Sequence, residues 1–105
     1  MDKLKREKYR PNLYIDSSIK KIFDTVSQKT FIDLDTEQLA HFSQIYRSGE
    51  GRDLFEKITG RKIDSDADIE NLFRAVALGE INLKEVLQSP ALKEYGKRTS
   101  PYALD

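Results

Sequence analysis

The sequence predicts an all-α fold, a small irregular bundle of about five or six short helices. Three observations predict it. Apolar residues recur at helical spacing in one segment after another, and Gly, Pro and capping residues separate these segments. No two segments alternate apolar and polar residues well enough to pair as strands. The length of 105 residues is that of one domain with one core.

The first amphipathic segment follows Asp16 and Ser17, either of which is a good helix N-cap. One apolar stripe at i, i+3, i+4 and i+7 consists of Ile19, Ile22, Phe23 and Val26. Residues 30–34 alternate weakly but have no partner strand in the rest of the chain. We therefore expect a helix of about three turns followed by an extended connector.

A second and a third helix are predicted by their caps and by the two glycines that end them. Asp35 precedes the second helix, whose apolar residues are Leu39, Phe42, Ile45 and Tyr46. Gly49 is placed to end it in the left-handed conformation. The third helix covers residues 51–59, is expected to bury Leu54, Phe55 and Ile58, and stops at Gly60.

The fourth predicted helix is the best candidate for the centre of the core. Asp64 or Ser65 caps it, and Gly79 ends it. Its apolar residues cover more than one stripe and are Ile69, Leu72, Phe73, Val76, Ala77 and Leu78. A helix that is apolar over so wide a face needs neighbours on more than one side.

Two short helices complete the predicted bundle. Asn82 and Glu85 form a variant of the capping box ahead of the fifth helix. Ser89 and Pro90 suit the N-cap and the first position of the sixth helix, which Gly96 is expected to end. The segments are short, so we expect the helices to cross at assorted angles around one core.

Charge divides the chain into a basic N-terminal segment and an acidic body. Residues 1–31 carry eight basic and four acidic side chains, and residues 32–88 carry seven and twelve, within a net charge of zero. We predict a basic arm or short helix at residues 1–12, a helical domain at 13–96 and a flexible tail at 97–105. The arm either binds an external polyanion or folds back on the acidic body, and the sequence leaves both open.

The chain is poor in residues that carry chemistry. It has no Cys and one His, so thiol chemistry and a zinc site built from Cys and His are not expected. His41 suits a general base by its titration range, but it falls at the edge of an apolar stripe, where a half-exposed histidine needs no catalytic role. We expect a non-enzymatic protein without a cofactor.

An aspartate series resembles the start of a calcium loop. Asp64, Asp66 and Asp68 alternate as such ligands do, but Ile69 and Ala75 occupy the positions that require Gly and a bidentate carboxylate. The same aspartates oppose the dipole of the helix that follows them. Helix capping is therefore the favoured interpretation.

The residues left for function lie at the two ends of the chain. The candidate contacts with a partner or a nucleic acid are Lys3, Lys5, Arg6, Lys8, Tyr9, Arg10, Tyr14, Lys97, Arg98 and Tyr102. We predict a small protein-interaction module, such as an adaptor, a regulator or a subunit of a complex, with a protein partner. The alternative is a nucleic-acid-binding protein that uses the basic arm.

The sequence also indicates where the protein works. No stretch of about 18 apolar residues is present, and residues 2–10 are too charged for a signal peptide. We therefore expect a cytoplasmic protein without membrane contact. Homo-oligomerisation stays open.

Overall fold

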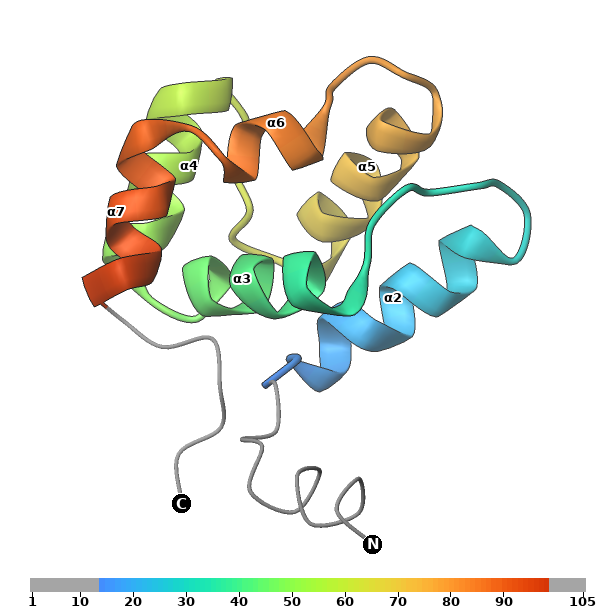
Figure 1. Ribbon diagram of the computed structural model, residues 1–105. Coiled ribbons are helices and arrows are strands. Elements are labelled where there is room, and N and C mark those ends of the chain that lie inside the picture. Colours follow the sequence, from blue (N-terminus) through green and yellow to red (C-terminus); the bar gives the residue numbers. More distant parts are fainter. Residues whose placement is uncertain (1–13, 99–105) are drawn as a thin grey trace, which may run out of the picture.

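The computed structural model describes residues 14–98 and confirms the all-α fold class. Within this range the chain forms six helices that hold 69% of the residues (Figure 1). Their bounds are α2 Ser17–Ser27, α3 Thr36–Tyr46, α4 Gly49–Thr59, α5 Asp66–Ala77, α6 Leu83–Leu87 and α7 Pro90–Arg98. Residues 31–35 connect α2 to α3 without helix or strand structure, and the Leu34 N–H donates to the Ile32 carbonyl oxygen at 3.0 Å, which makes a tight turn within the connector that was expected to be extended.

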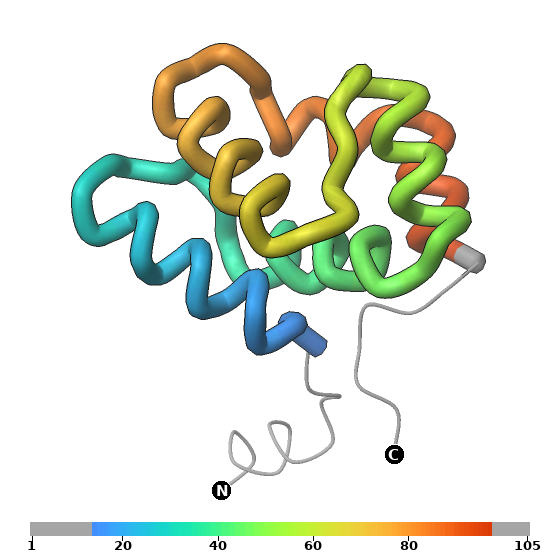
Figure 2. Tube along the Cα trace, turned by 180° about the vertical axis from the view of Figure 1, so that it is seen from behind, coloured from blue at the N-terminus to red at the C-terminus, as the bar shows by residue number. Residues whose placement is uncertain are grey.

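Two pairs of helices are joined by α3 and α6. Helix α2 packs along α5, and α4 packs against α7. Helix α3 contacts α2, α4, α6 and α7, and it runs across one side of both pairs (Figures 1 and 2). The short α6 leads the chain from the loop after α5 to α7, and it packs against α3 and α7 (Figure 1).

Three buried phenylalanine rings from three helices lie in the core, and the partly buried Phe23 packs against them. Phe73 of α5 meets Phe23 of α2 edge-on, with ring centroids 5.9 Å apart, and meets Phe42 of α3 at 5.8 Å. Phe42 in turn meets Phe55 of α4 at 5.7 Å. Such tilted and edge-to-face pairs add to the stabilisation from burial alone. The fourth helix contributes buried residues, as predicted, but its predicted central position was wrong, because α3 contacts four other helices whereas α5 packs chiefly along α2.

Local signals in the sequence set most helix ends. The predicted N-caps whose side chains accept backbone N–H groups are Asp16, Asp35, Ser65 and Asn82. Gln38 completes a capping box with Asp35. Gly60 and Gly79 adopt positive φ angles of 75° and 80° and end α4 and α5, as predicted.

The prediction for Gly49 was wrong. Helix α3 ends at Arg47 without a left-handed residue, and Gly49 is the first residue of α4. The reason is Ser48, whose hydroxyl accepts the Gly51 N–H at 3.0 Å and starts the next helix at once. Gly51 is needed for close approach, because a Cβ there would lie 2.3 Å from the Ile45 carbonyl oxygen.

Two residues predicted to be buried lie at the surface. The exposed fraction of the Leu78 side chain is 72%, and that of Ile58 is 38%. Leu78 is the C-cap of α5, beyond the last turn that its neighbours cover, and Ile58 lies in the last turn of α4. The apolar periodicity of each helix extends to these positions, but the neighbouring helices do not extend far enough to cover them.

Helix α7 begins at Pro90, as predicted, but ends later than predicted. The Ser89 carbonyl oxygen accepts the Lys93 N–H at 2.9 Å, as that of an N-cap residue does. The buried Ser89 hydroxyl has no hydrogen-bond partner among the described residues. Gly96 does not end the helix, which continues to Arg98, and a Cβ at Gly96 would lie 3.1 Å from His41 Nε2.

Candidate interaction site

The structure places only a few of the predicted contact residues. Seven of them, Lys3, Lys5, Arg6, Lys8, Tyr9, Arg10 and Tyr102, lie outside the described residues. Lys97 and Arg98, predicted to belong to a flexible tail, are instead the last two residues of α7, and Lys97 is exposed.

Tyr14 contacts its own domain. The Arg47 guanidinium lies over its ring, 4.8 Å from the centroid, and the Tyr14 hydroxyl donates to the Asp16 carboxylate at 3.3 Å. This ring already has a cation on one face, so it is held against the end of α3. Among the predicted contact residues that the structure describes, Tyr14 precedes α2, whereas Lys97 and Arg98 belong to α7.

His41 links α3 to α7. Its Nε2 lies 3.2 Å from the Leu92 carbonyl oxygen, and because a carbonyl oxygen only accepts, Nε2 carries the proton. Burial lowers the pKa of His41 from its ordinary value of 6.5, and the hydrogen bond to Leu92 opposes this shift. The imidazole thus has the half-buried, structural position that its place on the apolar stripe favoured.

The aspartate series makes contacts of the helix-capping kind. The Asp68 carboxylate accepts the Asp64 N–H at 3.0 Å, and the Asp64 carboxylate lies 3.6 Å from the Arg52 guanidinium. Asp66 and Asp68 occupy the first turn of α5. In the part of the chain that the structure describes, no group of three or more His, Cys, Asp or Glu side chains is arranged to hold a metal ion.

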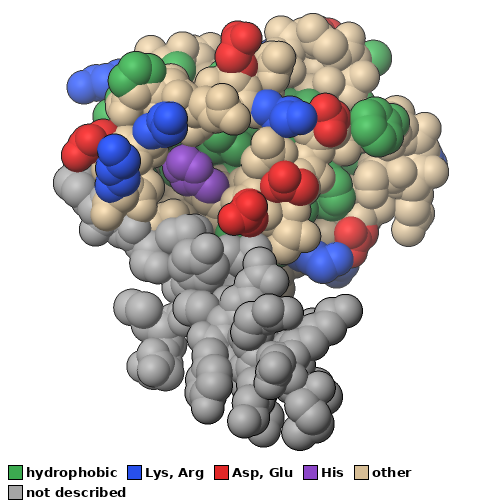
Figure 3. All heavy atoms as spheres, viewed as in Figure 1, with side chains coloured by type: hydrophobic (Ala, Val, Ile, Leu, Met, Phe, Trp, Pro, Cys, Tyr) green, Lys and Arg blue, Asp and Glu red, His purple; other side chains and the backbone are tan. Residues whose placement is uncertain are grey.

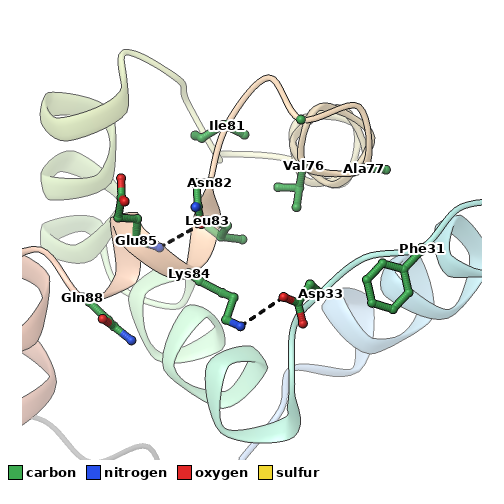
Figure 4. Close-up of a pocket in the computed structure, with 11 residues that line it drawn as sticks. Phe31, Asp33, Val76, Ala77, Ile81, Asn82, Leu83, Lys84, Glu85 and Gln88 are labelled. Carbon is green, nitrogen blue, oxygen red and sulfur yellow. Dashed lines mark hydrogen bonds and ion pairs between the residues drawn. The ribbon is translucent and has the colours of Figure 1, made fainter.

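One concave surface was not predicted from the sequence. A hollow of about 610 Å³ lies between the connector after α2, the C-terminal end of α5, the loop that follows it, and α6 (Figure 4). Phe31 and Asp33 form one side, Val76 and Ala77 lie on α5, and Lys84 reaches across from α6. The hollow is open to solvent.

Phe31 is exposed because its neighbour Ile32 is buried. In an extended segment successive side chains point to opposite faces. Ile32 enters the core with 6% of its surface exposed, so Phe31 points out with 82% exposed. Leu78 lies between Ala77 and Gly79, which both line the hollow. Of the two most exposed large apolar side chains of the described residues, Phe31 lines the hollow, and Leu78 does not line it but lies at the same end of α5.

A second hollow of about 370 Å³ continues along the other side of α6. Its walls include Glu37 and His41 of α3 and Lys93 of α7. Both hollows share Lys84 and Gln88, and we call the combined surface, bounded by residues 31–37, 76–88 and 93, the α6 trough. The Lys84 ammonium group binds the Asp33 carboxylate at 3.1 Å and joins the connector to α6 within it (Figure 4).

The α6 trough is acidic. Its lining holds four carboxylates, those of Asp33, Asp35, Glu37 and Glu85, against the ammonium groups of Lys84 and Lys93. In the Asp33–Lys84 ion pair the carboxylate is the more exposed partner, at 70% against 43%. Figure 3 shows acidic side chains in the middle of this face, with basic side chains beside and among them.

Comparisons with known proteins found no relative of the chain. No protein-family model, curated protein or solved structure matches the chain. Among residues 14–98, no helix has both the length and the apolar character needed to cross a membrane. The surface itself is therefore the basis for a functional interpretation.

Proposed function

We propose that the chain is a non-enzymatic protein-interaction module that binds its partner through the α6 trough. The observation that carries the proposal is the exposure of Phe31, at 82%, on the wall of the trough, and Leu78, at 72%, is exposed at the end of α5 that borders the hollow. Removing a Phe or Leu side chain from water gains about 1.5 to 3 kcal/mol, which is available to a partner that covers it. The other Phe rings of the described residues form the core or pack against it.

The form of the hollow favours a protein segment over a small molecule. Small-molecule sites enclose most of the ligand and converge a few polar groups on it. Here the hollow is open, Val76, Ala77 and Leu83 line it, and the ion pair between Lys84 and Asp33 spans it (Figure 4). Apolar anchors surrounded by polar residues are the usual composition of a protein interface.

A capture experiment with matched variants tests this function. The tagged chain, a Phe31→Ser/Leu78→Ser variant and an Ile58→Ser variant are each incubated with lysate of the source cell, and captured proteins are identified by mass spectrometry. Ile58 is the matched control because it is the other exposed large apolar residue and lies on α4, outside the trough. We expect a stoichiometric protein that the double variant loses and the control retains.

The same experiment separates the alternatives. Nuclease treatment of each lysate tests the predicted nucleic-acid-binding function of the arm, because such a complex would disperse with the nucleic acid. Light scattering of the purified chains shows whether the occupant is a second copy. A partner held equally by all three chains would contradict the proposed use of the trough.

A further inference from the structure

One end of the α6 trough is apolar and the other end is acidic, and this difference determines which side chains a bound segment needs. This inference rests on the proposed function and specifies the partner. At one end the apolar side chains of Phe31, Val76 and Ile81 line the first hollow, and the exposed Leu78 lies at the same end of α5. At the other end Asp35 and Glu37 line the second hollow. A segment that fills both hollows meets apolar surface first and carboxylates next.

The balance of charge along the trough favours a cationic segment. The four carboxylates of the lining outnumber its two ammonium groups, and they still outnumber the cations when the exposed Lys29, two residues before Phe31, is included. Lys84 is already bound to Asp33. Asp35, Glu37 and Glu85 have no ion pair within the described part of the chain, so their charge is available to a partner.

The apolar end carries negative potential as well. Helix α5 ends here at Leu78, and the C-terminal end of a helix bears a partial negative charge of about half a unit. Beside it, Glu80 forms an ion pair with Arg61 in which the carboxylate is again the more exposed partner, at 57% against 38%. The exposed ring of Phe31 also offers a face on which an arginine stacks favourably.

We propose that the α6 trough binds a basic amphipathic segment of another protein. Its apolar side chains pack against Phe31 and Leu78, and its Lys or Arg side chains lie along Glu85, Asp35 and Glu37. An acidic segment of the same apolar content is excluded by repulsion from the same carboxylates. The carboxylates set the choice of partner, whereas the apolar anchors supply most of the affinity.

A displayed library of random 16-residue peptides tests the inference with the 105-residue chain as bait. Selected peptides are counter-selected on the Phe31→Ser/Leu78→Ser variant, so that only trough-dependent sequences remain. We expect these to combine two or more large apolar residues with an excess of Lys and Arg. Trough-dependent peptides without a basic excess would overturn the inference and leave the proposed function standing. The absence of any trough-dependent peptide would overturn both.

Charge reversal provides the second measurement. For a selected peptide, the Glu37→Lys/Glu85→Lys variant is expected to raise the Kd about tenfold, because two attractive exposed pairs become repulsive. The matched control is Asp53→Lys, which reverses an exposed carboxylate on α4 outside the trough and should leave the Kd unchanged. Raising the salt concentration should weaken binding to the unaltered chain and have little effect on the double variant. Equal Kd values for the chain and the double variant would overturn the inference.

Discussion

Replacement of Phe73 by alanine is predicted to remove a large share of the stability of the fold. Its side chain is fully buried and touches the rings of Phe23 and Phe42. About 150 Å² of apolar surface is lost, which at about 25 cal/mol per Å² is about 4 kcal/mol. This agrees with the cost of about 3 to 5 kcal/mol typical of Phe→Ala in cores. The total free energy of unfolding of a natural domain is only about 5 to 15 kcal/mol.

Urea denaturation followed by circular dichroism measures this loss. Leu78→Ala is the matched control on the same helix, because Leu78 is 72% exposed and its truncation should cost less than about 0.5 kcal/mol. If Phe73→Ala does not fold, Phe73→Leu provides a smaller loss on the same scale. A loss below about 1 kcal/mol for Phe73→Ala would show that these rings do not pack in the core.

Two further predictions concern helix contacts. Gly51→Ala should cost about 1 to 3 kcal/mol in urea denaturation, since its Cβ would meet the Ile45 carbonyl oxygen at 2.3 Å; Gly49→Ala, with only the Arg52 side chain at 4.0 Å, should be neutral or stabilising. Burial lowers the pKa of His41 below 6.5 in the folded chain, so as the pH falls the unfolded chain takes up the His41 proton before the folded chain does. The contribution of His41 to the free energy of unfolding is therefore fully present above pH 6.5. Below pH 6.5 the free energy of unfolding falls by at most about 1.4 kcal/mol per pH unit, until the pH reaches the lower pKa of His41 in the folded chain. His41→Gln should remove this slope, and a slope that persists unchanged in the variant would refute the assignment to His41.

The sequence predicts the helices well because their signals are local. Asp35 and Gln38 form a capping box within four residues, and Gly60 and Gly79 end helices by their own conformational freedom. The error at Gly49 has a tertiary cause. Ser48 starts the next helix early enough that Gly51 must pass close to the Ile45 carbonyl. The close approach of Gly51 to Ile45 depends on how α4 packs against α3, so the apolar periodicity of neither helix predicts it.

The α6 trough was beyond the reach of local patterns. Its walls come from residues 31–37 and 76–93, and their proximity depends on how α2, α5 and α6 pack. The exposure of Leu78 has the same origin, because its helical period continues the buried stripe of α5. Phe31 carries only a weak local signal, since residues 30–34 alternate weakly and the burial of Ile32 is known only from the structure. The basic arm lies outside the described residues, so its contacts stay a prediction.

Site-specific photo-crosslinking at position 31 tests the central claim most directly. A photoreactive phenylalanine analogue is placed there in the full chain, or at position 58 as the control, and the source cells are irradiated before denaturing purification. The account predicts a discrete protein adduct from position 31, which Glu37→Lys/Glu85→Lys diminishes and which position 58 does not give. The same adducts from both positions, or none from position 31, would contradict it.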